Sequence, residues 1–260
     1  MRVYWFRRRR NFGDALVPVL LRRFSGLGAR WAHPALSDAV VIGSFAARLP
    51  RLYYGVVAGI GKFNDRDSPD LSRANVLGLR GELTLRGSRV RGDTVLGDPG
   101  LLAAQLLDRR PAVSHQLGIV PHYNDKTLAT RYPDAHYVDV ALDPIEVIRQ
   151  IAACDRVICS SLHSLIVADA LGIPRRWEPS PLGKGGPFKF HDYATALGMV
   201  LVPDKWDTAP AAAVETVVAR LRDVFREIPA AVAAERFRPL HRLAQSVDST
   251  RGWLFKHARL

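Results

Sequence analysis

Strand-like apolar runs alternate with helical patterns along most of the chain, and this alternation constrains the fold more than any other feature. The strand-like runs are Met1–Phe6, Asp38–Ile42, Leu52–Ala58, Asn75–Leu79, Gln116–Val120, His136–Asp139 and Arg156–Ser160. Helical patterns cover the segment with Leu16, Val19, Leu20 and Phe24, and then Asp98–Leu107, Asp125–Thr130, Pro144–Ala153 and His163–Leu171. Such alternation is typical of βαβ units, and it predicts an α/β fold with parallel sheets.

A polar stretch, Arg109–Ser114, contains a proline and interrupts this pattern. We place a domain boundary there, which predicts two Rossmann-like domains over residues 1–112 and 113–260. Near the end, Ala211–Ile228 keeps apolar residues at helical spacing, so this helix must cover apolar surface. Trp253 and Phe255 are expected to anchor the last stretch.

Composition is that of a globular protein: 48% of the 260 residues are hydrophobic and 24% are charged, which excludes low-complexity, collagen-like and coiled-coil chains. The two cysteines, Cys154 and Cys159, lack metal-ligand spacing and are expected to be core residues. They fit a reducing cytoplasm. No signal peptide and no uninterrupted apolar run of membrane-spanning length is evident, so the protein is expected to be soluble or peripheral to a membrane.

The net charge of +12 is unevenly distributed. Residues 1–112 hold 19 Lys and Arg against 9 Asp and Glu, whereas residues 113–260 hold 18 against 16. The N-terminal half therefore favours an anionic partner, which leaves nucleic acid, an anionic membrane surface or a phosphorylated substrate open. Nucleic acid is not expected, because the chain has no helix-turn-helix, zinc-finger or RNA-recognition motif.

Four polar segments lie where a predicted strand runs into a helix, the position at which α/β sheets bind ligands. They are Arg7–Asp14, Gly78–Glu82, Pro121–Lys126 and Ile158–Leu165. A further cation, Lys189, follows a glycine turn at Gly185-Gly186.

Each segment also has a purely structural interpretation. Asp14 is either a base or a helix cap, and Arg80 either holds an anion or pairs with Glu82. His122 is an acid, a base, an anion ligand or a residue without function. A serine hydrolase is disfavoured, because Ser161 and His163 are too close in sequence for a triad and no Gly-x-Ser-x-Gly elbow is present. The histidines show no metal-ligand spacing, and no metal is expected.

Taken together, these segments resemble the polysaccharide pyruvyl transferase family, in particular its bacterial exopolysaccharide branch. The matching pieces follow in order over residues 11–198: Asn11-Phe12-Gly13-Asp14, Leu79-Arg80-Gly81, Gly97-Asp98-Pro99, Val120-Pro121-His122-Tyr123, Ser160-Ser161-Leu162-His163-Ser164, Ala168–Pro174 and Lys189-Phe190-His191-Asp192-Tyr193. The resemblance implies transfer of the pyruvyl group of phosphoenolpyruvate onto two hydroxyls of a saccharide, which yields a cyclic ketal and phosphate. It also implies a glycosyltransferase-B-like fold with the ligand cleft between the domains.

By this resemblance His163 and Asp14 are the catalytic candidates. His163 is expected to protonate the methylene carbon and Asp14 to take the acceptor proton. The resemblance also implies a set of substrate-binding residues: Asn11, Gly13, Arg80, His122, Ser161, Leu162 and Lys189. The donor is expected on the C-terminal domain and the acceptor on the basic N-terminal one. No cofactor beyond this donor substrate is implied.

The chain departs from the family pattern at two positions. Ser161 stands where many members carry arginine, so Lys189, His122 or the Arg7–Arg10 run would supply that cation. Glu82 replaces the usual proline after the Arg-Gly pair, which leaves the local turn open.

A nucleotide-sugar glycosyltransferase of the same fold is the alternative, with Asp139 or Glu178 to hold a ribose. For the pyruvyl transferase, the expected partner besides the donor is a saccharide acceptor carried on a lipid, and the basic half suits peripheral contact with the inner face of a membrane.

Overall fold

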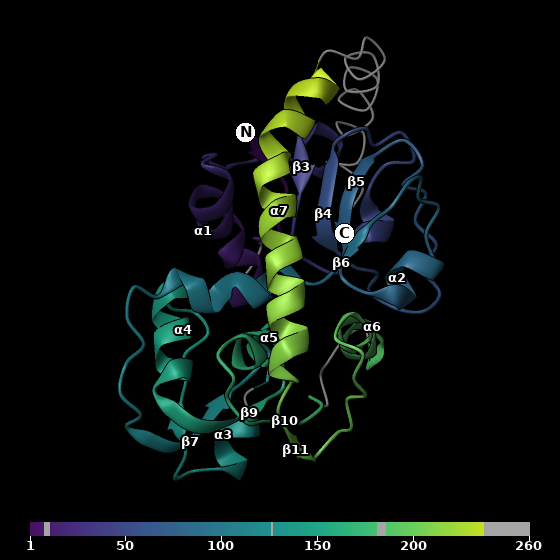
Figure 1. The fold of residues 1–260 in the computed structure, drawn as a ribbon. Coiled ribbons are helices and arrows are strands. Elements are labelled where there is room, and N and C mark those ends of the chain that lie inside the picture. The colour runs from purple at the N-terminus through teal and green to yellow at the C-terminus, as the bar shows by residue number, and fades with distance from the viewer. Residues whose placement is uncertain (8–10, 126, 181–185, 237–260) are drawn as a thin grey trace, which may run out of the picture.

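The chain folds into two β-sheets that follow one another in sequence (Figure 1). The computed structural model describes residues 1–7, 11–125, 127–180 and 186–236. The first sheet has six parallel strands in the order β2-β1-β3-β4-β5-β6. Its strands are β1 (Arg2–Val3), β2 (Arg30–Trp31), β3 (Ala39–Val40), β4 (Val56–Ile60), β5 (Asn75–Leu79) and β6 (Val95–Leu96).

The second sheet has five strands in the order β11-β10-β9-β7-β8, parallel except for the edge strand β11. Its strands are β7 (His115–Val120), β8 (His136–Tyr137), β9 (Cys154–Cys159), β10 (Arg175–Trp177) and β11 (Trp206–Asp207). The run β8-β7-β9-β10 repeats the order of β2-β1-β3-β4. The predicted α/β class with parallel sheets is confirmed.

Helices connect most of the strands. The α-helices are α1 (Phe12–Ser25), α2 (Glu82–Arg86), α3 (Thr127–Arg131), α4 (Pro144–Ala152), α5 (Leu162–Ala170), α6 (Phe188–Ala196) and α7 (Ala211–Arg236). Three 3-10 helices complete the set: η1 (Pro34–Leu36), η2 (Ala46–Arg48) and η3 (Pro99–Leu106). The helix predicted from Asp98 is this 3-10 helix, and Asp98 caps it as expected by accepting the Gly100 N–H at 2.9 Å.

Several strands are shorter than the sequence pattern predicts. Of Met1–Phe6 only Arg2–Val3 pairs in the sheet, and of Asp38–Ile42 only Ala39–Val40. The residues that follow these strands leave the sheet and line a cavity described below. The pattern also missed β2, β6, β10 and β11, because a strand of two or three residues gives almost no alternation to detect.

The largest apolar cluster joins both halves of the molecule. It includes Leu20 and Val56 from the first half and Val120 and Leu165 from the second. Neighbouring residues of the same strands point to the opposite face of the sheet and pack in smaller apolar clusters there, as Val57 does next to Val56. Both faces of each sheet are therefore covered, as parallel sheets require. Cys154 and Cys159 are buried in β9, which confirms them as core residues.

Helix α7 returns from the second half to the first and runs along the front of the molecule in Figure 1. It packs against α1, η3 and the strands β4, β5 and β6. Its buried residues recur at helical spacing: Val214, Val217, Leu221, Val224, Phe225 and Ile228. The expectation that this helix covers apolar surface is confirmed, and the surface belongs to the first sheet.

The domain boundary predicted at residues 109–114 stays a prediction. Trp253 and Phe255, which were expected to anchor the last stretch, lie outside the described residues.

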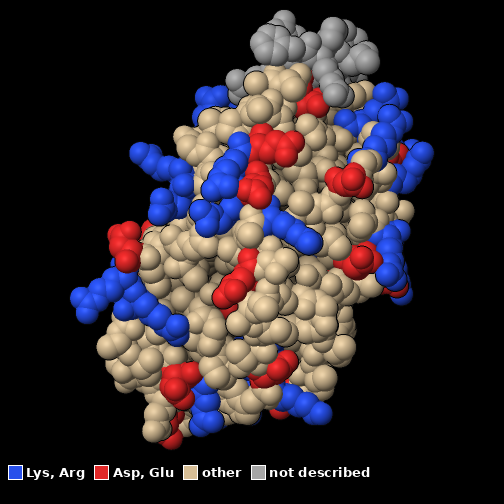
Figure 2. All heavy atoms as spheres, viewed as in Figure 1, with Lys and Arg blue, Asp and Glu red and all other residues tan. Residues whose placement is uncertain are grey.

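Lys and Arg side chains are numerous over the part of the molecule that holds the first sheet, the upper half of Figure 2. This agrees with the excess of basic residues in the first 112 positions. Within the described ranges, no helix combines the length and the apolar character that a membrane span requires.

We predict that Leu221→Ala destabilises the fold, because Leu221 is fully buried where α7 meets the first sheet. The free energy of unfolding measured in urea should fall by about 2–5 kcal/mol. Arg222→Ala is the matched control on the exposed face of the same helix and should change it by no more than about 0.5 kcal/mol. Equal effects of the two substitutions would contradict this account of α7.

Candidate functional site

The repeated strand order creates two equivalent positions, one in each sheet. In the first sheet the chain passes from β1 to β2 on one side and from β3 to β4 on the other, and in the second it passes likewise from β7 to β8 and from β9 to β10. Each sheet therefore has a switch point, between β1 and β3 and between β7 and β9. Open α/β sheets bind ligands at such points, beyond the carboxyl ends of the strands. The segments that follow all four strands meet around one cavity of about 510 Å³. The two switch points of the molecule therefore face one another across this cavity.

Residues from both halves line the cavity. From the first half they are Tyr4, Phe6, Asn11, Asp14, Gly43, Ser44, Phe45, Arg48 and Phe63. From the second they are His122, Tyr123, Asn124, Ser161, Leu162, His163 and Lys189. Seven of the nine site residues predicted from sequence are in these lists, and the other two, Gly13 and Arg80, lie directly behind the wall.

His163 lies in the first turn of α5, with its imidazole against the backbone of Gly13. A Cβ atom at Gly13 would fall 1.8 Å from Nδ1 of His163, so only glycine permits this contact. Burial lowers the pKa of His163 to about 3, and the positive charges of Arg80 and Lys189 add to the effect. At neutral pH the imidazole of His163 is therefore neutral.

Asp14 lies in the first turn of α1 and is almost fully buried. One carboxylate oxygen accepts the backbone N–H of Phe6 at 3.3 Å, and the other accepts the side-chain amide of Asn11. The N-cap position belongs to Asn11, whose side chain makes no capping bond. The capping interpretation of Asp14 is therefore wrong. Burial raises the pKa of Asp14 to about 7, so the carboxyl is poised between its two protonation states.

Lys189, near the start of α6, brings an ammonium group to the cavity. Burial lowers the pKa of Lys189 to about 8, and the nearby Arg80 contributes to the shift. His122 also lines the cavity, but burial and Lys189 lower its pKa to about 4, so it is neutral at pH 7. Of the groups proposed to replace the arginine absent at Ser161, Lys189 and His122 line the cavity, and of these two Lys189 is charged at pH 7.

The basic run after β1 contributes less than its sequence suggests within the described residues. The Arg7 guanidinium stacks on the ring of Trp31, 4.0 Å from its centroid. Arg8, Arg9 and Arg10 lie outside the described residues. A different arginine, Arg48 at the end of η2, lines the cavity and was not predicted.

Two helix N-termini point their N–H groups toward the cavity region. Ser161 caps α5 by accepting the N–H of Ser164 at 3.3 Å. Ser160 accepts the N–H of His122 at 2.9 Å, which ties the loops after β7 and β9 together. With α1 opening beside Asn11, helices from both sheets begin at the same cavity, and helix N-termini favour anions.

Arg80 is not among the residues that line the cavity, and its contact with the donor stays a prediction. It is 1% exposed, and its guanidinium forms an ion pair with Asp192 of α6 at 2.8 Å. It also donates to Ser44 Oγ, a cavity residue, and to the Lys62 carbonyl, both at 2.6 Å. The alternative prediction, that Arg80 pairs with Glu82, is wrong, because Glu82 pairs with Arg86 at 2.9 Å. Burial selects Asp192, since an enclosed guanidinium needs an equally enclosed carboxylate.

The turn after Arg80 is settled by its contacts with α6. A Cβ atom at Gly81 would fall 1.8 Å from the Asp192 carbonyl oxygen, so the close approach of α6 requires glycine. Glu82 opens α2, and its N–H donates to Thr195 Oγ1 at 2.8 Å. Proline at this position would remove that donor. The departure from the family pattern therefore adds a bond between α2 and α6.

Sequence reasoning missed the segment after β3, which contributes Gly43, Ser44, Phe45 and Arg48. A Gly-Ser pair after a buried strand was the available signal, but it is short and common. The sequence also predicted only a helix-capping role for Asp98. The structure places Asp98 Oδ2 3.8 Å from Nε2 of His163.

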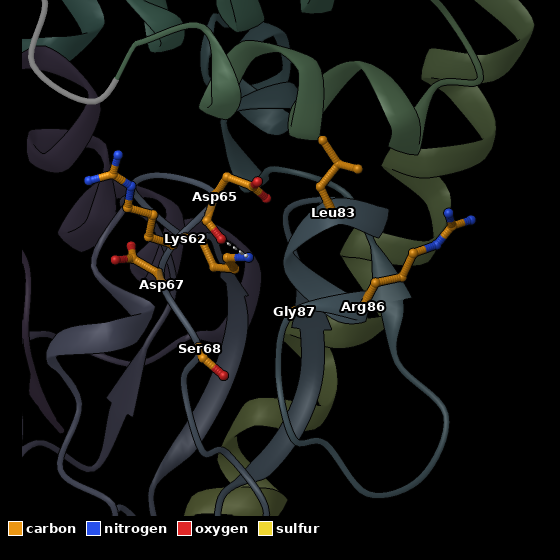
Figure 3. A pocket seen from close by; sticks show the side chains of 8 residues that line it. Lys62, Asp65, Asp67, Ser68, Leu83, Arg86 and Gly87 are labelled. Atoms are coloured by element: carbon orange, nitrogen blue, oxygen red, sulfur yellow. Dashed lines mark hydrogen bonds between the residues drawn. The ribbon is translucent and has the colours of Figure 1, made fainter.

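A second hollow of about 380 Å³ lies between the loop after β4 and α2. Lys62 is buried at its wall and donates to the Asp65 carbonyl at 3.2 Å, whereas Arg86 points away from it (Figure 3). This hollow shares no lining residue with the larger cavity.

The acidic residues considered for a nucleotide sugar are used elsewhere. Glu178 pairs with Arg176 at 3.0 Å and with Arg131, and it accepts the Tyr132 hydroxyl. Asp139 accepts the N–H of Ala141 at 2.9 Å. Neither lines the cavity. The glycosyltransferase alternative therefore gains no support from these two residues.

The cavity thus brings together cations, helix N-termini, a carboxyl group and an imidazole. The family model of polysaccharide pyruvyl transferases matches residues 11–177, a range that contains every predicted site residue except Lys189. The chain belongs to the polysaccharide pyruvyl transferase family.

Two individual proteins are similar to the chain. The succinoglycan biosynthesis protein ExoV of Rhizobium meliloti (strain 1021) is 29% identical over 213 residues, which cover 77% of this chain and 66% of that protein. The uncharacterized protein L143 of Acanthamoeba polyphaga mimivirus is 35% identical over 115 residues, 40% of each chain. The matches thus span less than two thirds of either relative.

We predict that Asp14→Asn stabilises the protein in a pH-dependent way. Asp14 titrates near 3.8 in the unfolded chain and near 7 in the folded protein. Between these values the folded state keeps a proton that the unfolded chain has lost, so stability falls as the pH rises from 4 to 7. Asparagine removes this cost. Its advantage over wild type in urea unfolding should be absent at pH 4 and reach up to about 4 kcal/mol at pH 8. An advantage that does not change with pH would contradict the raised pKa.

Proposed function

We propose that this protein transfers the pyruvyl group of phosphoenolpyruvate onto two hydroxyls of a saccharide in cell-surface or exopolysaccharide biosynthesis. Membership of the family and the similarity to a succinoglycan biosynthesis protein support this proposal. The observation that carries it is the meeting of Asp14 and His163, from opposite sheets, at one cavity. The two residues sit at the switch points of two parallel sheets, where substrates of α/β enzymes bind.

The charges around the cavity suit a small anionic donor. Phosphoenolpyruvate carries a carboxylate and a phosphate, which need cations and N–H donors. Lys189 and Arg48 provide the cations, and the N-termini of α1 and α5 provide oriented N–H groups. The volume of about 510 Å³ exceeds the needs of three carbons and a phosphate, which leaves room for a sugar. The aromatic residues Phe45, Phe63 and Tyr123 offer apolar surface to that sugar.

The reaction moves two protons. When the first hydroxyl adds to C2 of the enol, a proton is delivered to the methylene carbon and the hydroxyl loses its own. When the second hydroxyl displaces phosphate at C2, its proton leaves with the phosphate or passes to a base. A cyclic ketal and inorganic phosphate result, with no net oxidation. His163 protonates the methylene carbon and Asp14 takes a hydroxyl proton.

The protonation states of the empty cavity fit this division of roles once the donor is bound. The imidazole of His163 is neutral partly because Arg80 and Lys189 lie nearby. A bound phosphate and carboxylate offset these positive charges and raise the pKa of His163. Binding of the donor therefore favours protonation of His163, the acid of the proposed reaction. Asp14, with a pKa of about 7, is ionised in a large fraction of molecules and can accept a proton.

The saccharide is proposed to be presented on a lipid. The Lys and Arg side chains over the first half (Figure 2) suit peripheral contact with an anionic membrane surface at the cytoplasmic side. The pyruvyl-transferase site itself requires no cofactor beyond the donor.

The test of this function is phosphate release from phosphoenolpyruvate, with and without a panel of galactosyl, glucosyl and mannosyl acceptors. Acceptor-dependent release is expected. His163→Gln and Asp14→Asn should each lower turnover by about 100-fold or more, whereas Arg222→Ala should leave it unchanged. A thermal shift produced by nucleotide sugars, but not by phosphoenolpyruvate, would instead favour a glycosyltransferase.

Donor binding is also predicted to take up protons. Titration calorimetry at pH 8 in buffers of different ionisation enthalpy reports the number of protons bound with the donor. Wild type should bind up to about one proton more than His163→Gln, because the proposed mechanism protonates this imidazole when the donor binds. Lys189 and Asp14 remain in both proteins, so their contributions cancel. Equal proton uptake by the two proteins would exclude His163 as the acid.

A further inference from the structure

The imidazole of His163 has one nitrogen whose role the proposed reaction does not explain. Nε2 is inaccessible to solvent and has no hydrogen-bond partner among the residues that the structure describes. A buried polar atom is rarely left in this state, since it loses its water without gaining a partner. Nε2 points into the protein, whereas Nδ1 lies on the edge beside Gly13, and the residue itself lines the cavity.

Asp98 is the acidic side chain that faces this nitrogen. Its Oδ2 lies 3.8 Å from Nε2, and the carboxyl is 1% exposed. Its other oxygen, Oδ1, accepts the N–H of Gly100 at 2.9 Å, so the start of η3 holds the carboxyl in place. Asp98 therefore reaches His163 from behind, on the side away from the cavity.

We propose that Asp98 is a positioning residue for His163. Its Oδ2 accepts the proton on Nε2, which fixes the tautomer of the imidazole and leaves Nδ1 free to take up and deliver a proton in the cavity. The consequence for turnover rests on the proposed function, but the tautomer does not.

The separation of 3.8 Å is longer than a hydrogen bond. Hydrogen bonds that serve catalysis are often long in the absence of ligand and shorten when it binds. A proton gained at Nδ1 makes the ring an imidazolium, which strengthens its attraction to the carboxylate. Burial raises the pKa of Asp98 to about 6, so the group is an ionised acceptor at pH 7 and above.

The competing explanation is that Asp98 only caps η3. The chain contains a matched example, because Asp143 also precedes a proline and caps a helix, α4, by accepting the N–H of Ile145 at 2.9 Å. Asp143 is exposed and does not line the cavity. The same substitution at both positions therefore separates capping from an effect on His163.

The experiment compares Asp98→Asn with Asp143→Asn. Asparagine keeps an oxygen that can cap, but at position 98 it turns an NH₂ group toward Nε2, which then must be an acceptor. Nitrogen NMR of the imidazole, assigned by the signal lost in His163→Gln, should show the proton on Nε2 in wild type and Asp143→Asn. It should show the proton on Nδ1 in Asp98→Asn.

Turnover provides the second readout. Asp98→Asn should lower kcat by about 100-fold or more, with little change in KM for the donor and an altered pH profile, whereas Asp143→Asn should match wild type. Asp98→Ser retains a capping oxygen but lacks the carboxylate, and it should also lose turnover. It provides an independent test if Asp98→Asn does not fold.

An unchanged tautomer in Asp98→Asn, or a wild-type proton on Nδ1, would overturn the proposal. If wild type releases no phosphate with any acceptor, the proposed function fails, yet the NMR comparison still decides the role of Asp98.

Discussion

The buried ion pair between Arg80 and Asp192 is the interaction on which the arrangement of the site depends. It joins the end of β5 in the first sheet to α6 in the second half, at 2.8 Å and without contact with solvent. Asp192 also accepts the N–H and the hydroxyl of Thr84, so both carboxylate oxygens are used. Losing either charge would leave the other buried and unpaired. Lys189 reaches the cavity on the helix that this pair holds, and Arg80 also donates to Ser44 at the cavity wall.

Enclosure gives the cavity residues their chemical character. Burial, with the added effect of Arg80 and Lys189, lowers the pKa of His163 and keeps it neutral, and burial also raises the pKa of Asp14 and keeps it partly protonated. Perturbed pKa values of this kind are common at functional sites.

The two sheets contribute equivalent positions to the site because they share a strand order. Asp14 follows β1, on one side of the first switch point, and His163 follows β9, which corresponds to β3 on the other side; each lies in the first turn of the helix after its strand. Their helix N-termini thus converge on one cavity from opposite sides. The contact of His163 with Gly13 shows how closely the two halves approach at this point.

The sequence by itself determined the α/β class, the burial of Cys154 and Cys159, and the strand-to-helix junctions that carry Asp14 and His163. These features follow from local periodicity and turn chemistry, which act over a few residues. Only the tertiary structure decided that Arg80 pairs with Asp192 rather than Glu82, that α7 covers the first sheet, and that Arg48 and Asp98 lie at or near the site. The physical reason is that these choices depend on which distant groups are buried together, and burial across a hundred residues leaves no periodic trace in the chain.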